Sequence, residues 1–195
     1  MISEWPGLVA RPDRALIEDC LVLVEHLGVA RTVVDVGSGG GLPGIPLKIA
    51  RPDLEMTLIE ADQAKAAFLV HACAELGLQG VAVVATRAEE AGHDPRFREA
   101  FDVAVARALA PMPVLAELCL GLVRVGGRLL AQKTESEDLD AARNAVEVMG
   151  GALDSVHASP SAARRGGTVV VINKVGPTPA GYPRRPGVPS RKPLQ

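Results

Sequence analysis

Short apolar runs alternate with longer stretches of helical periodicity along this chain. The short runs and the turn residues beside them predict seven strands, at 32–36, 55–60, 81–85, 101–106, 128–133, 153–158 and 168–175. The longer stretches predict helices that begin near residues 13, 42, 63, 113 and 134. Asp13 has the position of an N-cap, and Thr134 with Glu137 has the spacing of a capping box.

Strands that alternate with helices predict a parallel sheet with helices on both faces. Only nine residues, 159–167, separate the last two strands. This connection is too short for a helical crossover, so the last strand should run antiparallel to its neighbour. We therefore predict an α/β domain over residues 1–175, with a short N-terminal helical extension and a seven-stranded, mostly parallel sheet. Ligands of such sheets bind beyond the carboxyl ends of the strands.

Residues 176–195 differ from the rest in composition. They contain six prolines, four basic residues and no acid, which predicts an extended, flexible tail without helix. The whole chain has a formal net charge of −2, so these four charges leave −6 for residues 1–175. A basic tail on an acidic body favours either an anionic partner or simple solvation, and the charge pattern does not separate the two.

Composition excludes several classes of protein. With 48% hydrophobic residues the chain can build a core, but it has no run of eighteen apolar residues, so we expect no membrane span. Three scattered cysteines predict a reducing, cytoplasmic location rather than disulfides. The four histidines lack the spacing of metal ligands, so we expect no metal site.

Residues 33–44 hold the strongest candidate for chemistry. A buried strand is followed by five glycines within eight positions and then by a helix, which is the arrangement of a nucleotide-binding turn. Two registers overlap: G-x-G-x-x-G from Gly39, as in dinucleotide sites, and G-x-G-x-G from Gly37 with Asp35 two residues before it. The second is favoured because Gly37 directly follows the strand.

An acid followed by G-x-G-x-G resembles the S-adenosylmethionine (SAM) loop of class I methyltransferases, in which the acid orients the turn. Glu60 ends the second strand, where a carboxylate can accept hydrogen bonds from both ribose hydroxyls. Since NAD enzymes use the same contact, Glu60 does not decide between the two ligands. The antiparallel last strand favours the class I methyltransferase fold and SAM.

The atom that receives the methyl group determines which other side chains the active site needs. Amino-group methylation of bases usually goes with an N/D-P-P-Y/F loop, but residues 107–111 read Arg-Ala-Leu-Ala-Pro. Methylation at carbon 5 of pyrimidines needs a nucleophilic cysteine, and Cys20, Cys73 and Cys119 fall inside predicted helices. Guanine N7 has a free lone pair and needs no general base, so it suits this chain.

Residues 34–47, Val-Asp-Val-Gly-Ser-Gly-Gly-Gly-Leu-Pro-Gly-Ile-Pro-Leu, resemble the signature of the bacterial small-subunit ribosomal RNA guanine-N7 methyltransferases, the RsmG (GidB) family. The Leu-Pro-Gly-Ile-Pro continuation is the specific part. Similar segments follow at 49–53, 60–69, 86–90, 101–108, 133 and 169–174, so the resemblance spans residues 31–175 with a further element at 182–187.

The resemblance implies SAM as the cofactor and small-subunit rRNA or its precursor particle as the partner of a monomeric enzyme. The implied cofactor-binding residues are Asp35, Gly37, Gly39, Gly41, Leu42, Glu60, Ala61, Ala88, Glu89 and Arg107. The implied catalytic residues are Arg107, beside the methionine end or the target base, and Lys133. The implied RNA-binding residues are Lys65, Arg164, Arg165, Arg184 and Arg185, with Lys133 also facing phosphate.

The chain departs from the family where RNA would bind. Asp19-Cys20 stands where an arginine–histidine pair is expected, Thr134 replaces a glycine, and Ala66 follows Lys65 in place of a basic residue. About thirty residues precede the first strand, fewer than in most relatives. Two alternatives therefore stay open: a diverged paralog that methylates a small molecule or another RNA with SAM, and a SAM-binding module that docks on the ribosome without catalysis. An NAD enzyme is a more distant third.

Overall fold

The computed structural model describes residues 14–194, so the expected cap at Asp13 lies outside the described residues. A single sheet contains seven strands in the order β3-β2-β1-β4-β5-β7-β6. Strands β1 to β5 pair in parallel, whereas β7 is antiparallel to both β5 and β6, as predicted. The strands are β1 Thr32–Val36, β2 Glu55–Ile59, β3 Val81–Val84, β4 Phe101–Arg107, β5 Val123–Thr134, β6 Gly151–Ala158 and β7 Gly167–Lys174.

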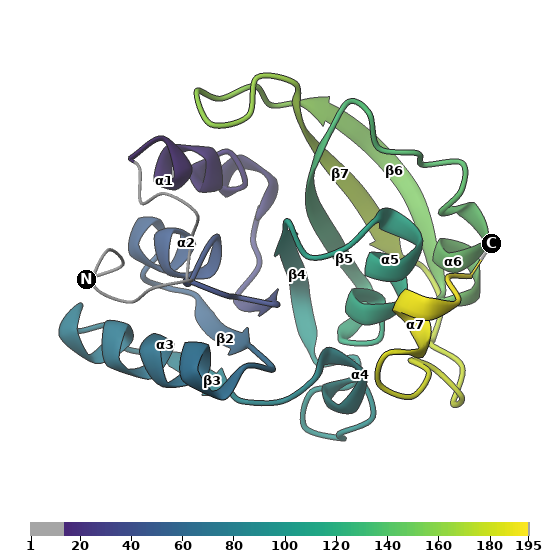
Figure 1. Cartoon of the computed structure of the whole chain (residues 1–195), viewed down its shortest axis with the longest axis horizontal. Coiled ribbons are helices and arrows are strands. Elements are labelled where there is room, and N and C mark those ends of the chain that lie inside the picture. The colour runs from purple at the N-terminus through teal and green to yellow at the C-terminus, as the bar shows by residue number, and fades with distance from the viewer. Residues whose placement is uncertain (1–13, 195) are drawn as a thin grey trace.

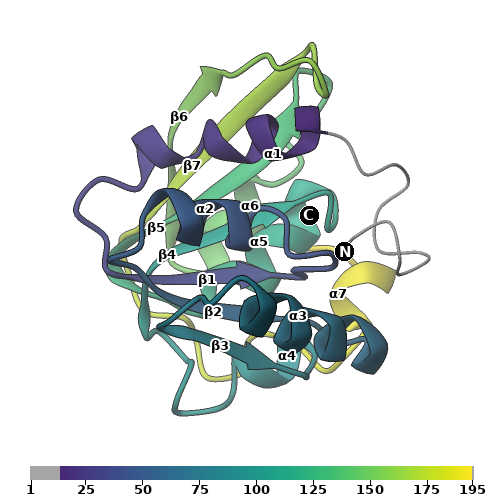
Figure 2. The same cartoon turned by 90° about the vertical axis from the view of Figure 1, so that its left-hand side faces the viewer.

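Helices cover both faces of this sheet. One layer contains α1, α2 and α3, which lie in front of the strands in Figure 2, and the other contains α4 to α7 (Figure 1). The helices are α1 Arg14–Leu21, α2 Gly44–Ala50, α3 Gln63–Glu75, α4 Ala88–Ala91, α5 Met112–Leu120, α6 Arg143–Val148 and α7 Val188–Arg191, with a 3-10 turn η2 at Val24–His26.

The alternation of side chains along each strand creates two cores, one for each layer of helices. On β1, Val33 packs with Leu47 of α2 and Phe68 of α3. Its neighbour Val34 points to the opposite face and packs with Leu115 of α5. Both faces of β1 are buried, as is typical of a strand inside a parallel sheet, and the buried positions include the polar residue Asp35 as well as three valines.

Two local expectations are wrong. Strand β5 begins at Val123 rather than at 128, because Gly126, at φ +86°, lets the chain continue through an irregular pairing with β4. Thr134 does not cap a helix: its hydroxyl contacts Ser136, and Glu137 accepts a hydrogen bond from the backbone of Met112 at 2.6 Å. The next helix, α6, begins only at Arg143.

The expectation that the C-terminal residues would form no helix is also wrong. They contain α7 and pack against the layer of α4 and α5 (Figure 1). The guanidinium of Arg98 donates to the backbone carbonyls of Thr178, Pro179 and Tyr182 at 2.7 to 3.1 Å. These bonds satisfy the carbonyls of a proline-rich segment that cannot join a sheet. The C-terminal segment is therefore packed against the domain in this structure, and its flexibility stays a prediction.

Candidate cofactor pocket

A pocket of about 410 Å³ lies at the carboxyl ends of β1, β2, β3 and β4. This volume is that of a typical small-molecule site. Eight of the ten predicted cofactor-binding residues line it: Gly37, Gly39, Leu42, Glu60, Ala61, Ala88, Glu89 and Arg107. The sequence pattern thus brought together residues from four separate strand ends.

The turn after β1 is held against the end of β2. The backbone N–H groups of Gly37 and Ser38 both donate to the carbonyl of Ile59, at 2.9 and 3.0 Å. Gly37 has a φ of +73°, and a Cβ at this position would come within 2.5 Å of Leu109. Glycine therefore suits this backbone conformation, and any larger residue would also require the end of the Leu109 side chain to move.

Asp35 lies beneath this turn and does not line the pocket. The side chain is fully buried, and one carboxylate oxygen accepts a hydrogen bond from the backbone of Gly44 at 2.9 Å. Burial raises the pKa of Asp35 to about 7. Asp35 thus ties the end of β1 to the start of α2, which is a role in shaping the loop. Gly41 also lies outside the pocket.

Glu60 organises the wall beside β2. One carboxylate oxygen accepts from the backbone N–H of Gly39 at 2.8 Å, and the other accepts from the N–H of Asp62 at 2.8 Å. Asp62 in turn caps α3 by accepting from the N–H groups of Ala64 and Lys65. Each oxygen of Glu60 has a second lone pair, so the carboxylate can still accept from a ligand's hydroxyl groups.

Glu89 forms the wall beside β3 and is 3% exposed. Its carboxylate accepts from the guanidinium of Arg87 at 3.2 Å and from the backbone N–H of Gly187 at 2.8 Å. Burial alone would raise the pKa of Glu89, but these donors outweigh burial and lower it. The C-terminal segment therefore helps to keep an ionised carboxylate in the pocket.

Arg107 ends β4 and is the one predicted catalytic residue that lines the pocket. Its Nε atom donates to the carboxylate of Asp19 at 3.2 Å, and its side chain is 19% exposed. The other predicted catalytic residue, Lys133, does not line the pocket. Its ammonium donates to the carbonyl of Ala110 at 2.5 Å and pairs with Glu137 at 3.1 Å.

Two predicted RNA-binding arginines are engaged within the protein. Arg164 donates to Asp19 and to the carbonyls of Lys133 and Thr168, and its side chain is 12% exposed. Arg184 forms a bidentate pair with Glu117, at 2.6 to 3.1 Å. Several of their donors are bonded to protein oxygens, although the buried Nη2 of Arg164 makes no hydrogen bond among the described residues. Both side chains are therefore held within the protein, and their contact with RNA phosphate stays a prediction. Arg165 and Arg185 are exposed, and Lys65 lines the pocket.

Asp19 is the residue that sequence reasoning missed. It lies in α1, is fully buried, and joins Arg107 to Arg164 and Ser161. Burial opposes its ionisation, but the hydrogen bonds from Ser161 and the two arginines lower its pKa overall. Asp19 falls within the predicted first helix, but its partners lie 88 to 145 residues away in the sequence, so no local pattern indicated this cluster.

The rest of the described molecule offers less chemistry. A second cavity of about 460 Å³ between α1, α2 and α3 is lined almost wholly by apolar side chains. Within residues 14–194, no cluster of histidine, cysteine, aspartate and glutamate could hold a metal ion, and no helix is long and apolar enough to cross a membrane. The three cysteines are buried and free, and burial raises the pKa of the Cys20 thiol to about 12.

Comparison with known proteins gives a consistent result. A family model described as rRNA small subunit methyltransferase G matches residues 13–165. Proteins of that name are 46% identical over 178 residues in Moorella thermoacetica, covering 90% of this chain and 74% of that protein, and 47% identical over 195 residues in Roseiflexus sp. strain RS-1, covering 99% and 82%.

Solved structures that resemble this one include a ribosomal protein L11 methylase from Lactobacillus delbrueckii subsp. bulgaricus. Its TM-score is 0.63 at 18% identity, with 88% of this chain and 83% of that chain covered. M. jannaschii TYW2 in complex with AdoMet has a TM-score of 0.60 at 15% identity, with 83% and 75% covered. At these identities the likeness concerns the fold, and it confirms the predicted class I methyltransferase architecture.

Proposed function

Because the chain belongs to the rRNA small subunit methyltransferase G (GidB) family, we propose that it transfers a methyl group from SAM to N7 of a guanine in small-subunit (16S) ribosomal RNA. The observation that carries the proposal is the pocket at the ends of β1 to β4, in which eight of the residues expected for SAM come together. The resemblance of residues 34–47 to the family's signature agrees with it.

The strand order supports one orientation of SAM. Glu89 follows β3, Glu60 follows β2, and Gly37 and Arg107 follow β1 and β4, so these groups lie in that order across the sheet. With Glu60 accepting from the ribose hydroxyls, adenine lies towards Ala88 and Glu89. The methionine portion then lies over Gly37, towards Arg107. In this orientation Gly37 and Arg107 would hold the methionine portion, and the RNA would approach at the end of β4.

The residues present fit the chemistry of methyl transfer to guanine N7. SAM supplies a methyl group on a positively charged sulfur, and N7 attacks with a lone pair that carries no proton. The chain therefore has to align the two reactants and exclude water, without removing a proton. The buried cysteines, with the pKa of Cys20 and Cys119 raised by burial, do not suit the thiolate nucleophile that methylation at carbon 5 requires.

We propose Arg165, Arg185 and Lys65 as contacts for RNA phosphate, since Arg165 and Arg185 are exposed and Lys65 lies at the pocket. Arg164, Arg184 and Lys133 are not included, because hydrogen bonds to oxygens of the protein hold each of these side chains in place. Precursor particles as the natural substrate, a monomeric state and a cytoplasmic location stay predictions.

The test is transfer of labelled methyl from SAM to small-subunit rRNA and to small subunits that lack the modification. Chain cleavage at 7-methylguanine then locates the product, and 5-methylcytosine analysis of the same RNA is the control. Glu60→Ala, which removes the carboxylate beside Gly39, should lower transfer in parallel with SAM binding. Binding of SAM without transfer to either RNA would favour a docking module, and transfer only to small metabolites would favour the small-molecule alternative.

A further inference from the structure

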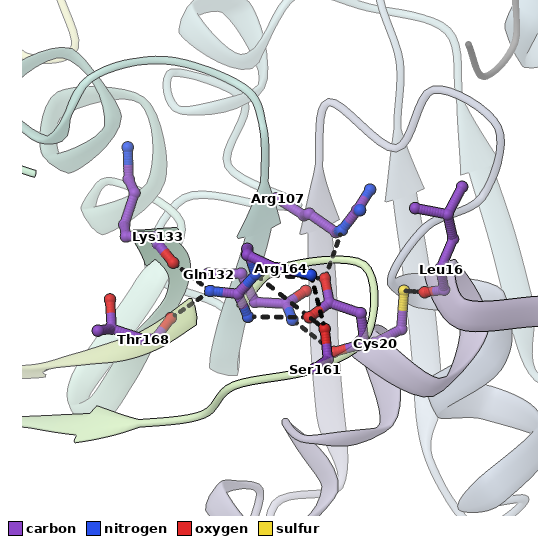
Figure 3. A network of polar contacts seen from close by, with 9 residues as sticks. Leu16, Cys20, Arg107, Gln132, Lys133, Ser161, Arg164 and Thr168 are labelled. Carbon is purple, nitrogen blue, oxygen red and sulfur yellow. Dashed lines mark hydrogen bonds and ion pairs between the residues drawn. The ribbon is translucent and has the colours of Figure 1, made fainter. Parts of the chain in front are cut away.

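Asp19 connects three parts of the chain that are distant in sequence. It comes from α1, Arg107 comes from the end of β4, and Ser161 and Arg164 come from the connection between β6 and β7. One carboxylate oxygen accepts from the hydroxyl of Ser161 at 2.7 Å and from Arg164 at 3.2 Å, and the other accepts from Arg107 at 3.2 Å. Figure 3 shows Arg107, Ser161 and Arg164 with the dashed contacts that they make. Their shared partner, Asp19, is fully buried.

The two arginines that share this carboxylate differ in how they are held. Arg164 also donates to the backbone carbonyls of Lys133 and Thr168, which fixes it to the ends of β5 and β7. Among the described residues, the side chain of Arg107 has one hydrogen-bond partner, Asp19. Arg107 donates to it through the Nε atom alone. The remaining amino groups of Arg107 extend away from Arg164 in Figure 3, and Arg107 lines the pocket.

Charge in this cluster is not balanced. Asp19 carries one negative charge, whereas Arg107 and Arg164 carry two positive charges, and all three side chains are at most 19% exposed. An anion at the free amino groups of Arg107 would balance the cluster. A carboxylate suits these groups well, because a guanidinium binds it through two parallel hydrogen bonds.

We propose that Asp19 is a positioning residue, which holds Arg107 by its Nε atom so that its free amino groups meet the carboxylate of the methionine portion of SAM. This assignment rests on the proposed function, which places that portion beside Arg107. Asp19 does not touch the ligand itself. Its contribution is to fix the direction of a long side chain that would otherwise lose conformational entropy on binding.

The experiment compares two ligands by calorimetry. SAM contains the aminobutyrate carboxylate, and 5′-methylthioadenosine keeps adenine, ribose and sulfur but lacks that group. Asp19→Asn removes the charge with little change in volume, and we expect it to weaken SAM binding about tenfold while 5′-methylthioadenosine binding changes less than about twofold. Glu18→Gln is the matched control, because it removes the same charge from the same helix. Glu18 is exposed and pairs with Arg14.

A double-mutant cycle tests whether Asp19 acts through Arg107. In an Arg107→Met background, Asp19→Asn should weaken SAM binding no further than about twofold. Equal weakening of both ligands, or additive effects in the double variant, would overturn the proposal in favour of a structural role for Asp19. If the unmodified protein binds neither ligand, the proposed function itself fails, and that result is distinct from failure of the Asp19 assignment.

Discussion

Arg184 and Arg185 are adjacent in the sequence, and we expect Arg184 to stabilise the fold and Arg185 to contact RNA phosphate. Arg184 forms a bidentate pair with Glu117 of α5, whose side chain is fully buried, and its backbone N–H donates to the same carboxylate at 2.7 Å. Arg185 is exposed. Replacing each by alanine removes the same charge, so the pair provides its own control.

The expected loss of stability follows from what Arg184→Ala leaves behind. Glu117 would keep the backbone donor of residue 184 but lose three side-chain contacts in a fully buried position. Removal of one partner of a buried pair costs roughly 3–5 kcal/mol, and since Arg184 is 24% exposed we take the lower end, about 3 kcal/mol. For a chain of this size that corresponds to about 6–12 °C in Tm. Arg185→Ala should change stability by less than about 0.5 kcal/mol.

Urea unfolding and thermal melting measure stability, and titration of small-subunit rRNA at several salt concentrations measures phosphate contacts. Arg184→Ala should lower the unfolding midpoint and leave the salt dependence of RNA binding unchanged under conditions where the variant is folded. Arg185→Ala should leave the midpoint unchanged and reduce the slope of log K against log salt by about one. The reasoning would be refuted if Arg184→Ala reduced that slope with no loss of stability.

Three other predictions follow from the buried groups around the pocket. Burial raises the pKa of Asp35 from 3.8 to about 7, so between these pH values the folded protein keeps a proton that the unfolded chain releases. Roughly 4 kcal/mol of the free energy of unfolding, present below pH 4, should therefore be lost as the pH rises to 7. Urea unfolding at pH 5, 6 and 7 should show that the free energy of unfolding falls more steeply with pH in the unmodified protein than in Asp35→Asn. The same dependence on pH in both proteins would contradict this prediction. Gly44→Ala would bring a Cβ within 2.5 Å of Leu58, so we expect a loss of about 2 kcal/mol and weaker SAM binding by calorimetry, with Gly181→Ala, which meets nothing within 4 Å, as the control. All three cysteines should react slowly with a thiol reagent until denaturant is added, and fast reaction of one equivalent in the native state would show that a thiol is accessible.

The sequence was sufficient to predict the parallel core of the sheet and the residues at its strand ends. The run at 32–36 coincides with β1, because a strand buried on both faces is rich in β-branched apolar residues, here three valines. The shortness of the connection at 159–167 predicted the antiparallel pairing of β7. These are local patterns, and the pocket follows from them because parallel strands end at the same edge of a sheet.

Contacts between distant segments could not be predicted in this way. The proline content of the C-terminal residues indicated correctly that they would not pair in the sheet. No local pattern showed that the side chain of Arg98 would donate hydrogen bonds to three of their carbonyls. Likewise, Arg164 was expected at a phosphate because its loop lies near the site, and the buried Asp19 that binds it is 145 residues away. The sequence shows the sign of the charge on a side chain, but it does not show which residue that side chain binds in the folded protein.

The hydrogen bond between the backbone of Gly187 and Glu89 has a consequence for the order in which the protein is made. A ribosome adds Gly187 after all seven strands of the sheet, including those whose ends form the pocket. A nascent chain that has emerged only as far as β7 therefore has every strand of the sheet but lacks the donor that helps to keep Glu89 ionised. The wall of the pocket beside β3 therefore gains this hydrogen bond only after the whole sheet has been synthesised.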